Sequence, residues 1–95
     1  MFEIEITSHF RKRYKKLVSK NKNVKNKIIK AIETLRKDPG YPSLKTHKVF
    51  ISEYGDVFSS SVTGDIRIIW TKIKNELVLL LLDLGKHSGK HSVYD

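Results

Sequence analysis

A run of six apolar residues, "LVLLLL" at positions 77–82, limits the folds available to this chain of 95 residues. A helix that spans a bilayer needs roughly 20 apolar residues, so this run is too short to cross a membrane. An apolar run of this length is typical of a β-strand that is buried on both faces. We therefore expect a strand here that lies in the interior of a sheet.

The chain before residue 40 carries the pattern of one strand followed by two helices. "FEIEIT" at 2–7 alternates apolar and polar residues, which predicts a short strand with one buried face. Ser8 is the expected N-cap of an amphipathic helix over 9–20, and a second amphipathic helix over 24–37 ends before Pro39. The two helices are expected to form an αα-hairpin.

Four further strands are predicted in the segments "LKTHKVFI", "DVFSSSV", "IRIIWTKI" and "ELVLLLLDL". Because tight turns separate the later segments, the strands should be antiparallel. The expected fold class is α+β, in the order β-α-α-β-β-β-β, with the two helices packed on one face of a small, mostly antiparallel sheet and the other face partly open. We expect a single domain over residues 1–95 with a polar C-terminal tail at 86–95.

The positive charge is concentrated in the predicted hairpin. The chain has 19 Lys and Arg residues against 10 Asp and Glu residues, a formal net charge of +9. Residues 9–37 hold twelve of the basic residues and a single acid, Glu33. Such a surface attracts nucleic acid, an acidic protein or an anionic membrane surface, and a merely solvated basic surface is the alternative.

Cysteine is absent, which excludes disulfides and thiolate sites and favours a cytoplasmic location. The N-terminal segment "MFEIEITSHF" lacks the basic and apolar regions of a signal peptide. A cytoplasmic protein with no membrane association is therefore expected.

Two histidines near the C-terminus, His87 and His91 in "GKHSGKHSVYD", allow three interpretations. The spacing of four residues suits a metal site on a helix, but the intervening "SGK" contains a poor helix former and no carboxylate. A solvated tail is the second interpretation, although Val93 and Tyr94 suggest a segment that docks on the fold. The third interpretation is part of an active site that follows the last strand.

Arg67 is the unusual residue of the strand "IRIIWTKI", because alternation places it among apolar side chains on both faces of the strand. It either extends to solvent or pairs with Asp65 or Asp83, or it holds a phosphate group through two parallel hydrogen bonds. The sequence leaves both interpretations open.

Three of the four histidines have lysines beside them, in "KTHK" around His47 and in the two "GKHS" segments. Imidazoles next to cations suit phosphodiester chemistry on RNA, in which a base takes a proton from a 2′-hydroxyl and an acid protonates the leaving oxygen. This chemistry needs no metal and no cofactor, and none is expected. The neighbouring lysines that are candidates for RNA binding are Lys45, Lys48, Lys86 and Lys90.

The order of these segments resembles the RelE/ParE superfamily of bacterial toxins, and within it the RelE and YafQ-like messenger-RNA endonucleases. The resemblance covers nearly the whole chain. It rests on "GDIRIIW" at Gly64–Trp70, which matches G-D-x-R-[IV]-I-[WYF], and on the Leu-rich strand that runs into Gly, His and a terminal Tyr. It implies a toxin of a type II toxin–antitoxin system that cleaves messenger RNA in the ribosomal A site without a metal.

The resemblance also implies roles for individual residues. Arg67 matches the phosphate-binding arginine, and His47 matches the histidine that follows the second helix in YafQ-like members. His87 matches a histidine proposed to transfer protons, although His91 could occupy the same position because of the duplicated "GKHS". Tyr94 matches a terminal aromatic residue that stacks on a base or assists proton transfer.

The partners that the resemblance implies are a cognate antitoxin, the ribosome with its messenger RNA, and operator DNA through the antitoxin complex. We expect the basic helices to face ribosomal RNA, with the acidic antitoxin as competitor. The helix lysines expected to make this contact are Lys12, Lys15 and Lys16.

One departure from the family pattern concerns the strand before the Gly-Asp turn. Many RelE-type members have arginines there, whereas this chain has "SSSVT" at 59–63, so one cationic contact is expected to be missing.

Two other functions stay open at this stage. A ParE-like gyrase inhibitor would not need the histidines, and an inactive relative would bind RNA or antitoxin without cleavage.

Overall fold

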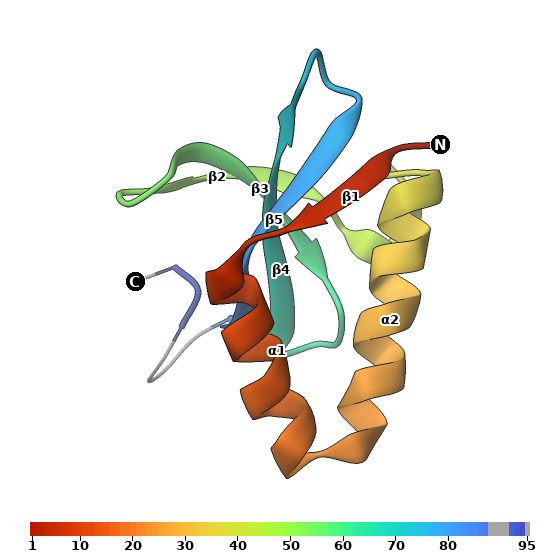
Figure 1. The fold of residues 1–95 in the computed structure, drawn as a ribbon, viewed down its shortest axis with the longest axis vertical. Coiled ribbons are helices and arrows are strands. Elements are labelled where there is room, and N and C mark those ends of the chain that lie inside the picture. The colour runs from red at the N-terminus through yellow and green to blue at the C-terminus, as the bar shows by residue number, and fades with distance from the viewer. Residues whose placement is uncertain (88–91, 95) are drawn as a thin grey trace.

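The computed structural model describes residues 1–87 and 92–94, which form two helices packed on one five-stranded sheet (Figure 1). The elements are β1 (Glu3–Ile6), α1 (Ser8–Lys20), α2 (Lys22–Lys37), a short 3-10 helix η1 (Pro42–Leu44), β2 (His47–Ile51), β3 (Gly55–Ser61), β4 (Ile66–Ile73) and β5 (Val78–Lys86). This order matches the expected β-α-α-β-β-β-β arrangement.

The strand order in the sheet is β1-β5-β4-β3-β2, so the Leu-rich strand β5 lies between two neighbours, as its sequence predicts. β5 pairs in parallel with β1 and antiparallel with β4, and the remaining pairs are antiparallel. The expectation of a mostly antiparallel sheet in an α+β fold is therefore confirmed.

The main hydrophobic core lies between the sheet and the helices. Phe10 of α1 and Ile28 and Leu35 of α2 are buried against Trp70 of β4 and Leu84 of β5. Period-two alternation sends the neighbouring strand residues to the opposite face of the sheet. We call that opposite face the open face.

A second, smaller cluster covers part of the open face. It consists of Ile51, Val57, Ile69, Leu82 and Val93. Val93 is only 2% exposed, although it belongs to the segment expected to be a polar tail. The chain near its C-terminus therefore docks on the sheet, as the apolar character of "VY" suggests.

The first helix begins one residue earlier than its pattern predicts. Thr7, and not Ser8, is the N-cap, because the Thr7 hydroxyl accepts a hydrogen bond from the Phe10 amide. Ser8 is the first helical residue, so the predicted cap is wrong by one position. Thr7 also lies at the end of β1, where its hydroxyl donates to the carbonyl oxygen of Leu81 in β5 at 2.9 Å.

In the part of the chain that the structure describes, no helix is both long enough and apolar enough to span a membrane.

Candidate active site

Strand pairing lines up two rows of residues across the open face. The first row contains His47, Ser59, Ile69 and Asp83, which are direct partners across β2, β3, β4 and β5. Paired residues on neighbouring strands point to the same face of a sheet. His47 and Ser59 therefore share this face with Ile69.

The second row contains Ser61, Arg67 and Gly85, which are partners across β3, β4 and β5. Arg67 thus points to the open face, away from the helices. Because Gly85 has no side chain, the space next to Arg67 on β5 is left to groups from other elements.

The Arg67 guanidinium is the most unusual group on this face. Its Nε and Nη1 atoms are buried and have no hydrogen-bond partner among residues 1–87 and 92–94. Pairing with Asp65 or Asp83, the alternative that the sequence leaves open, is not observed in these residues. The side chain of Asp83 instead forms ion pairs with His9 and Arg13 of α1. Buried donors without partners are costly, so a guanidinium held in this way is suited to bind an anion.

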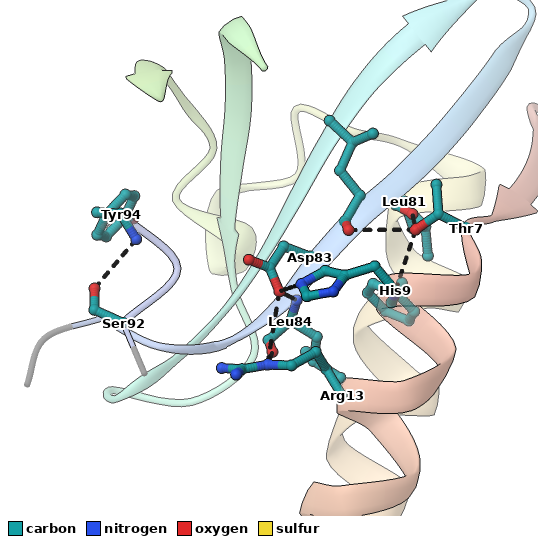
Figure 2. Close-up of polar contacts among 10 residues, drawn as sticks. Thr7, His9, Arg13, Leu81, Asp83, Leu84, Ser92 and Tyr94 are labelled. Atoms are coloured by element: carbon teal, nitrogen blue, oxygen red, sulfur yellow. Dashed lines mark hydrogen bonds and ion pairs between the residues drawn. The ribbon is translucent and has the colours of Figure 1, made fainter. Parts of the chain in front are cut away.

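The C-terminal segment brings Tyr94 and His87 to the same face. The Tyr94 hydroxyl lies 2.5 Å from the hydroxyl of Ser59, and the His87 and Tyr94 rings meet edge to face with centroids 5.1 Å apart. The amide of Val93 donates to the carbonyl of Lys86, and the amide of Tyr94 donates to the Ser92 hydroxyl (Figure 2). The structure therefore places four predicted site residues, His47, Arg67, His87 and Tyr94, on one face.

His47 is exposed at the edge of the sheet, and its Nδ1 atom lies 3.1 Å from the carbonyl oxygen of Lys45. When Nδ1–H donates to that carbonyl, Nε2 is the ring atom that can accept a proton. Lys48 follows His47 in β2, so its side chain leaves the strand on the other face. The expected close grouping of His47 and Lys48 is therefore wrong, because adjacent strand residues point in opposite directions.

The other candidate lysines are distributed over several surfaces. Lys86 pairs with Ile66, a residue of the helix-side core, so its side chain also leaves β5 away from Arg67. Lys12 and Lys16 are exposed on α1, whereas Lys15 lines an apolar groove between α1 and α2. His91 and Lys90 lie outside the described residues.

A polar cluster that the sequence pattern does not predict lies at the edge of β5. Asp83 lies 3.1 Å from His9 Nε2 and 3.7 Å from Arg13 Nε, and both basic residues extend from α1 (Figure 2). His9, at the start of α1, therefore contacts β5 through its side chain. The spacing of four residues between His9 and Arg13 marks one helix side, but their partner Asp83 on β5 is seventy or more residues away in sequence.

Within residues 1–87 and 92–94, the His, Asp and Glu side chains form no group of three or more that could hold a metal ion. Asp83, the partner of Ile69 across β4 and β5, is engaged by two basic residues of α1.

Comparisons with known proteins identify the family. Residues 2–90 match the model of YafQ, a bacterial toxin of type II toxin–antitoxin systems. The chain therefore belongs to the YafQ toxin family, within the RelE/ParE superfamily that its motifs resemble. A comparison with curated protein sequences finds no significant match.

Solved structures show the same fold. A metal-bound toxin from Helicobacter pylori is 26% identical with a TM-score of 0.74, and the match covers 92% of this chain and 96% of that chain. The DinJ–YafQ complex of Escherichia coli gives 21% identity and a TM-score of 0.72, covering 97% of this chain and 100% of that chain. The archaeal RelE–RelB complex of Pyrococcus horikoshii gives 17% identity and a TM-score of 0.71, covering 92% and 96%.

Proposed function

We propose that this type II toxin is a ribosome-dependent, metal-independent endoribonuclease that cleaves messenger RNA in the A site and so inhibits translation. The observation that carries the proposal concerns the Arg67 guanidinium. Its Nε and Nη1 atoms are buried and have no hydrogen-bond partner among residues 1–87 and 92–94, and the residue lies on the same face as His87, His47 and Tyr94. An anion-binding group that shares a sheet face with two imidazoles provides the kinds of group that RNA cleavage requires. Family membership supports the same reaction.

The proposed reaction starts with attack of a 2′-hydroxyl oxygen on the adjacent phosphorus. A neutral imidazole takes the hydroxyl proton, and the bond from phosphorus to the 5′-oxygen breaks as a second group protonates that oxygen. The products are a 2′,3′-cyclic phosphate and a 5′-hydroxyl. DNA lacks the 2′-hydroxyl and would not react.

Arg67 stabilises the charge on the phosphate oxygens, and two parallel N–H donors of a guanidinium match that geometry. His87 is the proposed proton-transfer group next to Tyr94, and His47 in the row of Ser59 is the second imidazole. The hydrogen bond between the hydroxyls of Tyr94 and Ser59 fixes the position of the Tyr94 ring, on which a base can stack.

We further propose that residues 1–95 act as one toxin domain in the cytoplasm, where ribosomes are present. DinJ and RelB are bound to the related toxins of Escherichia coli and Pyrococcus horikoshii, which supports a cognate antitoxin as the partner of this chain. Binding to operator DNA would then occur through the antitoxin complex. The charge of +9 favours an acidic antitoxin and an RNA substrate alike.

Primer extension on purified translating ribosomes tests the function. The wild-type protein should cut within A-site codons, and Arg67→Ala and His87→Ala should each lower the cleavage rate by roughly 100-fold or more, the scale expected when a charge-stabilising or proton-transfer group is removed. Lys20→Ala, on the exposed last turn of α1, is the matched control and should cleave at the wild-type rate.

Intact transcripts with the wild-type protein would contradict the proposal. A supercoiling assay with DNA gyrase would then decide whether the protein inhibits gyrase, and lethality that survives loss of His47, His87 and His91 together would support that alternative.

A further inference from the structure

Gly85 is the direct partner of Arg67 across β4 and β5, and of Gly40, Gly55, Gly64 and Gly85 it is the one that other elements approach most closely. A Cβ atom at Gly85 would overlap with Arg13 Nη2 and would lie 3.2 Å from Val93 Cγ1. The first overlap places one end of the Arg13 guanidinium directly over the Gly85 Cα atom. Since Val93 belongs to the open-face cluster, this end of Arg13 reaches the open face.

Paired residues on antiparallel strands have Cα atoms about 5 Å apart. The Arg13 guanidinium therefore lies next to the base of the Arg67 side chain, although the two residues come from different layers of the fold. The first helix thus contributes a cation to a face of the sheet that it does not cover.

Arg13 is held in this position by the backbone and by a carboxylate. Its Nε atom donates to the carbonyl oxygen of Leu84 at 2.9 Å and lies 3.7 Å from Asp83 Oδ1. His9 binds the same Asp83 oxygen at 3.1 Å, so the carboxylate joins two successive turns of α1 to β5. The Arg13 side chain is 23% exposed and is thus packed rather than free in solvent.

We propose that Arg13 is a second phosphate-binding residue of this site and acts together with Arg67. This inference rests on the proposed function and extends it to a residue outside the sheet. Two guanidiniums on one side of a reacting phosphodiester share the charge that develops on its oxygens. Arg13 supplies, from the helix, the cation that the segment "SSSVT" at 59–63 lacks.

Gly85 has a specific role under this proposal. Any side chain there would displace either Arg13 or Val93, so the absence of a side chain opens the path by which Arg13 reaches the site. Asp83 and His9 are positioning residues, because they act through Arg13.

The direct test observes the two arginines in the wild-type protein by NMR. The Nε–Hε signals of Arg13 and Arg67 are followed during titration with inorganic phosphate, and then with a trinucleotide that carries a 2′-deoxyribose at the cleavage position and cannot react. Both signals should shift along one binding curve with a single Kd. This test does not depend on cleavage and uses the unmodified protein.

Each outcome of the titration separates this inference from the proposed function. A shift of Arg67 alone would overturn the role of Arg13 and leave the phosphate site in place. No shift of either arginine would contradict the phosphate site itself.

A kinetic test complements the titration. Arg13→Gln should reduce kcat on translating ribosomes by about 10- to 100-fold, the loss expected for a charge-assisted contact in the transition state. Arg13→Lys should recover part of the loss, whereas Lys20→Gln, two turns further along α1, should stay within about twofold of the wild type. Wild-type kcat for Arg13→Gln in a folded protein would overturn the proposal.

Gly85→Ala provides a second variant that leaves both arginines in the sequence. It should lower kcat and remove the Arg13 signal change in the phosphate titration while the Arg67 signal still shifts. Thermal unfolding of each variant reports whether the fold is retained, and an unchanged Arg13 response in Gly85→Ala would contradict the role given to Gly85.

Discussion

Ser60 joins three parts of the molecule through a chain of hydrogen bonds. The indole N–H of Trp70 donates to the Ser60 hydroxyl at 2.8 Å, and that hydroxyl lies 2.6 Å from the hydroxyl of Thr46. The Thr46 hydroxyl donates to the carbonyl of Pro39, so Ser60 is the donor to Thr46. β4 contributes residues to the open face and also buries Trp70 on the helix side, where this series of hydrogen bonds provides an acceptor for the indole N–H.

Replacement of Ser60 by alanine should destabilise the protein by about 2 kcal/mol, since it leaves the buried indole N–H without an acceptor. Ser60 is fully buried, so water cannot substitute without rearrangement. Urea denaturation measures the change, with Ser52→Ala in the exposed turn before β3 as the control. Equal midpoints for the two variants would show that the hydrogen-bond chain contributes nothing.

The ionisation of Tyr54 should make the stability of the protein depend on pH above pH 10. Burial, and then the charges of Glu53 and Asp83, raise the pKa of Tyr54 from 10.0 to about 12. A raised pKa in the folded state means that the folded protein binds more protons than the unfolded chain in this interval. The contribution to stability is therefore complete below pH 10 and is lost as the pH rises toward 12.

The free energy of unfolding of the Tyr54→Phe variant should fall less steeply between pH 10 and 12 than that of the wild type. Chemical denaturation at several pH values in this interval measures both slopes. Parallel slopes would show that the ionisation of Tyr54 is not linked to folding.

At the level of elements, Thr7 connects three segments at one point. Its hydroxyl caps α1 through the Phe10 amide at 3.1 Å and donates to Leu81 in β5, while its own amide also donates to Leu81. This residue therefore sets where α1 leaves β1 and how it meets β5. The position of Arg13, two turns further along, depends on the same junction.

Thr7→Ala should cost about 1–2 kcal/mol of stability, the usual effect of removing an N-cap hydroxyl. Ser8→Ala should change stability by less than about 0.5 kcal/mol, because Ser8 is an exposed residue of the first helical turn. Thermal or urea unfolding of both variants distinguishes the observed cap from the one expected from sequence. A larger loss for Ser8→Ala would contradict the cap seen in the structure.

The elements themselves follow from local sequence patterns, whereas their junctions do not. Alternation and helical spacing predict β4 and both helices to within two residues, since those signals depend only on near neighbours. Lys48 is adjacent to His47 in sequence, but the pleat of β2 sends the two side chains to opposite faces of the sheet. The cap at Thr7 was missed because Thr7 and Ser8 are both common N-cap residues and only the contact with β5 selects between them.

At the scale of the whole molecule, the charge of the hairpin is distributed unevenly around the site. Lys12 and Lys16 lie on the side of α1 that carries His9 and Arg13, so they border the end of β5 from which the C-terminal segment continues. If the proposed function holds, we expect this surface to contact ribosomal RNA next to the proposed cleavage site.

Charge reversal tests this expectation. The triple variant Lys12→Glu, Lys15→Glu and Lys16→Glu should bind ribosomes more weakly, and its slope of log K against log salt should be shallower by about 2–3 because roughly three phosphate contacts are lost. Reversal of Lys22, Lys25 and Lys27 on α2 makes the same change in net charge. Equal losses in the two triple variants would indicate attraction by net charge alone and contradict a specific role of α1.

Some residues of the site are predicted from the sequence, and Arg13 is not. Arg67, His47, His87 and Tyr94 were selected from their chemistry and from the family resemblance, and alternation places Arg67 on a defined strand face. For Arg13, the sequence predicts only a place on a basic helix. Its proximity to Gly85 depends on how α1 crosses the end of β5, and this long-range contact leaves no periodic signal in the sequence.

The strand order has a consequence for the synthesis of the protein. β5 forms ladders with both β1 and β4, yet it is translated after all four other strands. Nascent chains stalled before Val78 should therefore be digested by protease, because the helices have no complete sheet on which to pack. We expect a newly made toxin to become harmful only after β5 has left the exit tunnel, which protects the ribosome that is producing it and gives an antitoxin translated nearby time to bind.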